Sequence, residues 1–301
     1  MSALRSGRRA VLAGLLFVAG ASFAQPPPPA GREGGGPPRP PRPDRKQVLA
    51  WADVRSGVQH DSVTRALVTI ERLGRESGLY DTCIRTDSQL ITKQPILMPG
   101  RSFPITDKNL DYFDAIFFFG VREIEIDERQ KADLLAFVKN DGKGFVAAHT
   151  ASTAFFSWPE FGELLGGRFD EHPWNVVDAT VVVEAPDFPA MRPLAPRSVV
   201  RDEHYQTKDF SRDHIRVLAS LDPASVDLAN PRVHRRDGDF PVAWARTYGK
   251  GRVFYSSLGH APESWDDPRI QQMYLGALKW ALGLEPGDAT PRPRPVAPVA
   301  R

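Results

Sequence analysis

The segment from Gly144 to His149 constrains the fold of this chain more than any other stretch. Phe145 to Ala148 form a short apolar run without a polar face, and glycines close the helical pattern that precedes it. Such a run is typical of a strand buried on both faces of a parallel sheet. His149 follows where the strand should end, and open α/β sheets bind ligands beyond the carboxyl ends of their strands. The segment therefore predicts a buried strand that places one imidazole at a candidate site.

Strand and helix patterns alternate in the first half of the chain. Helical spacing begins after His60, with Asp61 or Ser62 as N-cap, and Asp127 with Gln130 predicts a capping box at a second helix. Strands are predicted over residues 47–52, 79–86, 114–120 and 145–148. Because this order produces βαβ units with right-handed crossovers, we expect an α/β fold with an open, mostly parallel sheet flanked by helices.

The second half of the chain is richer in strand patterns than in helices. Strands are predicted over residues 179–183, 198–201, 215–220, 242–247 and 252–256. Tyr248 to Gly251 is a tight hairpin signal between the last two of these strands. A final amphipathic helix is predicted from Pro268 to the stop at Gly283. We therefore expect a β-rich C-terminal half added to the parallel sheet.

Both ends of the chain differ in composition from the middle. Residues 1–24 combine basic residues, a short apolar run and the small-x-small pattern Ser22-Phe23-Ala24, which is typical of a secretory signal peptide. This run is too short for a stable membrane span. Nine prolines within residues 26–43 and five within residues 286–301 predict a disordered linker over 25–45 and a disordered tail over 285–301. The folded domain is expected over residues 46–284, exported to the periplasm or the cell exterior.

The charge distribution argues against a nucleic-acid partner. Residues 1–45 hold seven arginines against two acidic residues, and residues 285–301 hold three against two. Since the whole chain carries +2, residues 46–284 carry −4. The basic pI therefore belongs to the tails and does not indicate a nucleic-acid surface.

Several kinds of chemistry are excluded by missing residues. Cys83 is the single cysteine, so an internal disulfide and a thiol pair are ruled out, and its apolar neighbours favour packing over nucleophilic attack. The chain also lacks a nucleophile elbow, a Walker loop, an H-E-x-x-H motif and a dinucleotide-binding glycine motif.

Histidines at the ends of predicted elements remain as the carriers of chemistry. Two of the seven histidines, His214 and His234, lie in charged stretches and are expected to be solvated. Each of the others is compatible with a structural role as the partner of a backbone carbonyl, and also with a site. These five junction histidines are His60, His149, His172, His204 and His260.

An ordered set of short motifs resembles the ThuA-like (trehalose utilisation) family. The motifs are Gln59-His60-Asp61-Ser62, Gly144 to His149, Trp158, Leu164 to Gly167, Phe169, His172-Pro173, Asp202 to Tyr205, Pro241 to Trp244, Gly249 to Tyr255 and Leu258-Gly259-His260. The resemblance implies a class I glutamine-amidotransferase-like fold, related to the flavodoxin-like architecture, and a link to disaccharide or keto-sugar metabolism. No cysteine stands at the nucleophile position, so glutaminase chemistry is not expected.

The chain departs from the family pattern at three places. Ser152-Thr153 stand where many members have an aspartate, His204 stands where the usual residue is tryptophan, and Phe240 stands where the usual residue is histidine. These departures indicate a shifted substrate or a weakened activity.

Two functions of different classes are compatible with these residues. The first is an enzyme acting on a small-molecule carbohydrate, with His149, His172, Glu203 and His260 as catalytic groups and His60, Trp158, His204 and Tyr205 as substrate-binding groups. A variant of it places a divalent metal such as zinc on His149, His172 and His260. The second is a non-catalytic carbohydrate-binding or envelope interaction module.

The enzyme hypothesis makes a geometric prediction. His149, His172, Glu203 and His260 should lie in one cleft at the carboxyl edge of the parallel strands, lined also by His60. The substitution His149→Ala is then expected to abolish activity with little change in thermal midpoint, because a cleft side chain contributes little to the core.

Overall fold

The computed structural model describes residues 44–57 and 59–294, all within one compact unit. The predicted signal peptide, nearly all of the predicted linker and residues 295–301 lie outside this part of the chain. None of the helices in the described residues is long and apolar enough to cross a membrane.

A nine-stranded sheet forms the centre of this unit, in the order β2-β1-β3-β4-β11-β10-β9-β6-β7. The first five strands pair in parallel: β2 (Tyr80–Arg85), β1 (Lys46–Trp51), β3 (Ala115–Phe118), β4 (Gly144–Ala148) and β11 (Gly251–Ser256). The rest pair antiparallel: β10 (Pro241–Tyr248), β9 (Arg216–Leu221), β6 (Val176–Val183) and β7 (Arg197–Glu203). The predicted fold class, a parallel α/β core with an added β-rich half, is confirmed.

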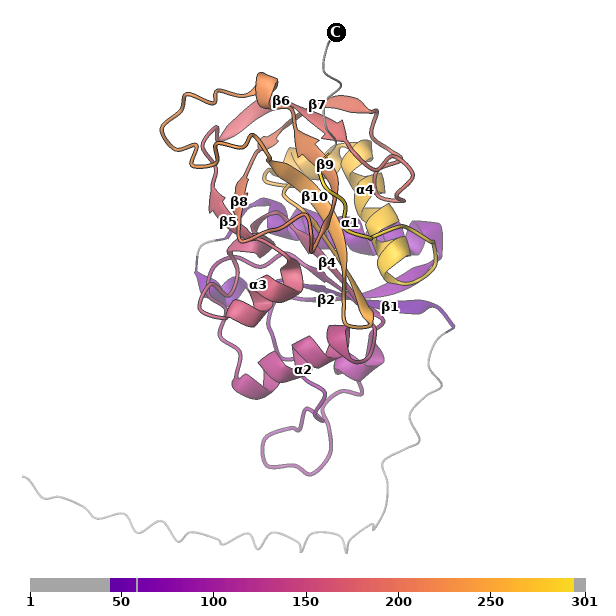
Figure 1. Ribbon diagram of the computed structural model, residues 1–301. Coiled ribbons are helices and arrows are strands. Elements are labelled where there is room, and N and C mark those ends of the chain that lie inside the picture. The colour runs from indigo at the N-terminus through magenta and orange to yellow at the C-terminus, as the bar shows by residue number, and fades with distance from the viewer. Residues whose placement is uncertain (1–43, 58, 295–301) are drawn as a thin grey trace, which may run out of the picture. The chain divides into compact units, whose positions relative to one another are not determined.

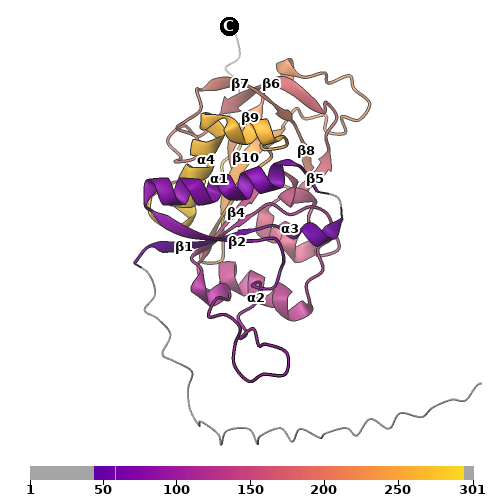
Figure 2. The same cartoon turned by 180° about the vertical axis from the view of Figure 1, so that it is seen from behind.

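Helices cover both faces of the parallel strands (Figures 1 and 2). Side chains alternate between the faces along a strand, so Val48 and Ala50 of β1 face one core while Leu49 and Trp51 face the other. The first core is completed by α1 (Ser62–Ser77) and α4 (Pro268–Ala281). The second is completed by α2 (Glu128–Lys139) and α3 (Pro159–Leu165).

The two predicted helix starts differ in outcome. The capping box of α2 is present, with Asp127 accepting from the backbone N–H of Gln130 and the Gln130 side chain accepting from that of Asp127. Asp61 occupies the N-cap of α1, but its side chain makes no capping hydrogen bond. Its backbone is already helical, with φ −59° and ψ −23°, whereas a capping side chain needs an extended backbone to reach the first free N–H groups.

The region after His149 contains elements that the sequence pattern does not predict. A short 3-10 turn (His149–Thr153) leads into α3, and β5 (Arg168–Glu171) pairs antiparallel with β8 (Gln206–Lys208) in a separate two-stranded sheet. Further 3-10 turns are Val54–Ser56, Leu110–Tyr112, Pro223–Ser225 and Pro262–Asp266. Strands of three and four residues are too short to give a periodic signal.

Residues beyond the predicted domain end at 284 continue to pack on the protein. The Trp280 indole N–H donates to the carbonyl of Gly287, and the Arg294 guanidinium donates to the carbonyls of Asp237 and Gly238. Described contacts therefore extend to residue 294, ten residues past the boundary that proline content indicates.

Candidate functional site

The register of β4 and β11 fixes the first contact of the site. These neighbouring parallel strands pair Ala148 with Ser256, so His149 and Ser257 follow side by side at the carboxyl edge. The His149 Nδ1–H donates to the carbonyl oxygen of Ser257 at 2.6 Å. Because a carbonyl can only accept, this bond places the proton on Nδ1 and leaves a lone pair on Nε2 of the neutral ring. His149 thus presents a defined acceptor to the site.

Glu203 approaches His149 from β7, the strand at one end of the sheet order. It is the last residue of β7, and the preceding Asp202 accepts the backbone N–H groups of Gly259 and His260 at 2.8 and 3.0 Å. Gly259 has φ 123°, and a Cβ there would lie 2.9 Å from the Trp265 ring, so the loop requires glycine. The Asp202 carboxylate therefore holds the loop after β11 against the end of β7.

Three side-chain atoms, one each from His149, Glu203 and His260, lie in a small triangle. We call these three residues, together with His60, the His/Glu cluster. The His260 Nδ1 is 3.2 Å from the Glu203 Oε2 and 3.1 Å from the His149 Nε2. The His149 Nε2 is 3.5 Å from the Glu203 Oε2. The Tyr205 hydroxyl also donates to the His149 Nε2, at 2.8 Å.

His60 completes the His/Glu cluster from the loop that follows β1. Its ring centroid lies 5.1 Å from that of His149 and 4.9 Å from that of His260. One ring nitrogen from each of His60, His149 and His260 and one oxygen of Glu203 lie within 4.8 Å of one another. The structure therefore brings together side chains from four separate segments of the chain.

His172 lies at the rim of this cluster. It follows β5, and its Nδ1 is 3.6 Å from the second Glu203 oxygen, Oε1. The Arg232 guanidinium is 3.2 Å from the same Nδ1, and about a third of the His172 side chain is exposed. Glu203 thus faces His149 and His260 through Oε2 and His172, at the cavity, through Oε1.

Burial and charge set the protonation of these groups. Burial, with the adjoining imidazoles of His149 and His260, lowers the pKa of His60 to about 4, so the ring is neutral at pH 7. The hydrogen bond with Glu203 raises the pKa of His260. Burial alone would raise the pKa of Glu203, but the contacts of its carboxylate with the imidazoles of His149 and His260 outweigh burial and hold that pKa well below its usual range.

His149 is fully buried and has a left-handed backbone, with φ 44°. A non-glycine residue in this region costs about 1–3 kcal/mol and is concentrated at functional sites. Removal of the ring would leave the Ser257 carbonyl and the Tyr205 hydroxyl without this partner. The expectation that His149→Ala leaves the thermal midpoint nearly unchanged is therefore corrected, because this side chain belongs to the packed interior.

Two of the residues expected to bind substrate lie elsewhere. His204 follows β7 directly and is fully buried, with its Nε2 3.1 Å from the carbonyl of Val200 on β7. Trp158 is 6% exposed and packs on Phe155 and Phe161. The side chain of residue 203 points toward the cluster, and since side chains alternate along a strand, its neighbour 204 points away from it.

A cavity of about 390 Å³ opens on the cluster. Its lining includes His60, Phe169, His172, Glu203 and Tyr205. A second cavity of about 500 Å³ has Asp202 and His260 among its lining residues. Glu203 therefore lines one of these two cavities, and its partner His260 lines the other.

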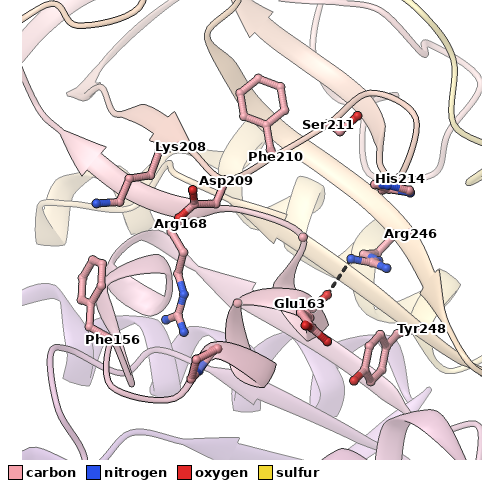
Figure 3. Close-up of a pocket in the computed structure, with 13 residues that line it drawn as sticks. Phe156, Glu163, Arg168, Lys208, Asp209, Phe210, Ser211, His214, Arg246 and Tyr248 are labelled. Atoms are coloured by element: carbon pink, nitrogen blue, oxygen red, sulfur yellow. Dashed lines mark hydrogen bonds between the residues drawn. The ribbon is translucent and has the colours of Figure 1, made fainter.

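A larger cavity of about 790 Å³ lies beside α3, away from the cluster. Figure 3 shows Phe156, Arg168 and Lys208 along one side of it and Glu163, Arg246 and Tyr248 along the other. The Arg168 guanidinium there donates hydrogen bonds to backbone carbonyls, among them those of Phe155 and Trp158. The chemical groups that line a cavity, rather than its volume, therefore identify the candidate site. Phe156 lines both this cavity and the one at the cluster.

Sequence reasoning missed the supporting residues of the site. Asp202 stands inside the motif Asp202 to Tyr205, but only its bonds to the Gly259 and His260 N–H groups give it a role. Ser257 contributes a backbone carbonyl, for which the side chain carries no signal. Cys83 lies on β2, where burial raises the pKa of its thiol, as expected for a packing residue.

The fold and the site together define a class: an α/β protein with a His/Glu cluster at the carboxyl edge of its parallel strands. The family model for ThuA, described as trehalose utilisation, matches residues 47–281. The chain therefore belongs to the ThuA family. A comparison with curated proteins gives no match.

Solved structures of related fold include two ThuA-like proteins. The one from Bacteroides uniformis is 22% identical over 82% of this chain and 95% of its own, with a TM-score of 0.61. The one from Parabacteroides merdae is 15% identical over 79% and 90%, with a TM-score of 0.58. A cytoplasmic protein from Salmonella typhimurium is 12% identical over 78% and 98%, with a TM-score of 0.50. At these identities the likeness concerns the fold.

Proposed function

We propose that this protein is an enzyme that acts on a carbohydrate, a disaccharide or a keto-sugar, at the cavity over the His/Glu cluster. The observation that carries the proposal is Glu203, a carboxylate gathered with three imidazoles and lying 3.6 Å from a fourth, His172, in the wall of the same cavity. The family's link to trehalose utilisation supports a sugar as the substrate class.

The lining of the cavity favours proton transfer over ordinary glycoside hydrolysis. Its volume of about 390 Å³ lies within the range of about 300–1,000 Å³ of small-molecule sites. Among the described residues that line it, Glu203 is the only carboxylic acid, whereas ordinary glycosidases use a flanking pair. A single carboxylate beside His172 suits acid–base exchange with a hydroxyl or with a carbon next to a keto group.

The proposed roles divide between contact and positioning. Glu203 and His172 line the cavity and would exchange protons with the sugar. Tyr205 and His60 line it beside them and would orient the ring. His149 is fully buried and acts through its contacts with Tyr205 and Glu203, so it is a positioning residue in this proposal.

The substitution His172→Ala tests this assignment. Purified protein is incubated with trehalose, other disaccharides and their keto derivatives, and products are followed by mass spectrometry. We expect His172→Ala to lower kcat/KM by roughly 10²-fold, the lower range for loss of an acid–base group. The thermal midpoint should stay nearly unchanged because the side chain is a third exposed.

The matched control is His234→Ala. His234 is likewise a partly exposed histidine near a carboxylate, Asp170, but it does not line the cavity. Equal losses in the two variants would contradict a specific role for His172. Binding of a sugar without turnover in the wild type would contradict the enzyme proposal and support a carbohydrate-binding module.

We also propose that the protein is exported, from the pattern of residues 1–24. Expression of the full chain in a Gram-negative host should yield a periplasmic product whose N-terminus is Gln25, measured by intact-mass analysis of the periplasmic fraction. A product that keeps residues 1–24 and stays in the cytoplasm would contradict export.

A further inference from the structure

We propose that His60, His149, Glu203 and His260 bind one divalent transition-metal ion, with zinc as the ion that the donor set fits best. This site concerns the same cluster as the proposed function and deepens it. Metal binding is measured without any substrate, so failure of the metal site and failure of the enzyme proposal are distinguishable.

The separations between donor atoms fit a bound ion. Zinc bonds of about 2.0–2.2 Å to nitrogen and oxygen in tetrahedral geometry place neighbouring donor atoms about 3.4 Å apart. The three measured separations are 3.1 Å (His149 Nε2 to His260 Nδ1), 3.2 Å (His260 Nδ1 to Glu203 Oε2) and 3.5 Å (His149 Nε2 to Glu203 Oε2). Three side chains from different strands thus already stand at ligand spacing.

The hydrogen-bond roles leave a place for a cation. The Ser257 carbonyl fixes the proton of His149 on Nδ1, so the Nε2 lone pair points toward Glu203 Oε2, which is itself an acceptor. Apart from the Tyr205 hydroxyl, which donates to this Nε2 at 2.8 Å, the two acceptors face each other at 3.5 Å with no proton between them, an arrangement that a positive charge between them would stabilise. A metal ion supplies that charge and satisfies both atoms.

His60 provides the fourth donor and an independent sign of a missing partner. Its Nδ1 is buried and has no hydrogen-bond partner among the described residues. Buried polar atoms in proteins are paired in the great majority of cases, so an orphaned nitrogen on a ring that supplies one of the four clustered atoms indicates a ligand at the cluster.

The residues that hold the proposed ligands in place are those expected of a metal site. Histidines that bind metals nearly always donate their other ring N–H to a carbonyl or a carboxylate, as His149 does to Ser257. Asp202 fixes the backbone of His260 through two N–H groups. The left-handed backbone of His149 indicates that its ring is held in place at a conformational cost.

His172 is excluded from the ligand set, in contrast to the set predicted from the sequence. Its Nδ1 approaches the other carboxylate oxygen, at 3.6 Å, and faces the Arg232 guanidinium at 3.2 Å. A nitrogen beside a cationic donor is a poor metal ligand. Three imidazoles and one carboxylate, without thiolate, select a borderline first-row ion such as zinc over calcium or magnesium.

The test uses untagged, chelator-treated protein and titrates it with Zn²⁺ by calorimetry at neutral pH, with Co²⁺ absorption to report coordination. We expect about one site per chain and a tetrahedral Co²⁺ spectrum. His60→Ala and Glu203→Gln should each weaken Zn²⁺ binding by at least about 100-fold, because loss of outer partners alone costs about 10–100-fold. Circular dichroism verifies that each variant is folded. If one of them is not folded, His260→Ala, at a partly exposed position, is used in its place.

The matched control His172→Ala should change Zn²⁺ affinity by less than about threefold, and His234→Ala serves the same purpose for a surface histidine. A loss in His172→Ala as large as that in His60→Ala would overturn the ligand set. Failure of the wild-type protein to bind Zn²⁺ or Co²⁺ more tightly than about 10⁻⁴ M would overturn the metal site itself, whether or not sugar turnover is found.

Discussion

Glu203→Gln is expected to lower kcat/KM for the sugar substrate by about 10²–10⁴-fold, the range for loss of an acid–base group. The change keeps the shape of the side chain but removes the charge that faces His149 and His260. Because glutamine is isosteric and the side chain is 12% exposed at the cavity, we expect a thermal midpoint within a few degrees of the wild type. Steady-state kinetics and calorimetric melting measure the two quantities.

Glu163→Gln is the control for this substitution. Glu163 lines the cavity beside α3, away from the cluster, so its loss should leave kcat/KM within about threefold if that cavity takes no part in turnover. Unchanged turnover in Glu203→Gln would sink the assignment of the site. An equal loss of kcat/KM in both variants would indicate that the active site includes the region around Phe156, which lines both cavities.

Arg212→Met is expected to destabilise the protein by about 3 kcal/mol, the lower end of the cost of breaking a buried ion pair. The Arg212 guanidinium bonds to Glu184 and Asp239 at 2.8–2.9 Å, and the three side chains are only 9–10% exposed. Burial would lower the Arg212 pKa, but its hydrogen bonds to the two carboxylates raise it instead. Without the arginine, two nearly buried carboxylates repel each other.

The network that Arg212 forms joins the antiparallel strands. Glu184 follows β6, Ser220 lies on β9 and bonds to Glu184, and Asp239 precedes β10. For a domain of this size, a loss of 3 kcal/mol lowers the midpoint by roughly 6–12 °C. Thermal and urea unfolding of the variant measure the change.

Arg65→Met provides the comparison, because Arg65 forms one exposed ion pair with Asp266, at 3.0 Å. Pairs of this kind contribute about 0–1 kcal/mol, so the midpoint should move by less than roughly 4 °C. Equal shifts in Arg65→Met and Arg212→Met would contradict the role of the buried network.

The parallel half of the fold could be predicted from the sequence because each of its elements carries its own local signal. The apolar run of β4 and the capping box of α2 are properties of a few neighbouring residues. The hairpin between β10 and β11 follows from its glycines in the same way. The placement of His149, and of His60 and His260 after β1 and β11, also follows, since the carboxyl ends of parallel strands share one edge of the sheet.

The approach of Glu203 to these histidines was decided by tertiary structure alone. β7 is the edge strand, four places from β11 in the sheet order, so strand order by itself would separate Glu203 from His260. Contact arises because the end of β7 packs on the loop after β11, where Asp202 accepts the N–H groups of Gly259 and His260. Such bonds join residues more than fifty positions apart, and no local pattern encodes them.

The exposure of each site residue likewise came only from the packed structure. Residues 203 and 204 are both polar and adjacent, yet strand alternation gives Glu203 to the cavity and buries His204 against the Val200 carbonyl. His172 and His60 look alike in sequence as junction histidines, but the pairing of β5 with β8 leaves His172 at the rim, whereas the loop after β1 carries His60 into the cluster. The sequence by itself determined which residues could carry chemistry and that several would meet at one sheet edge. Long-range packing decided which of them meet, because donor distances of about 3 Å depend on how strands distant in sequence are stacked.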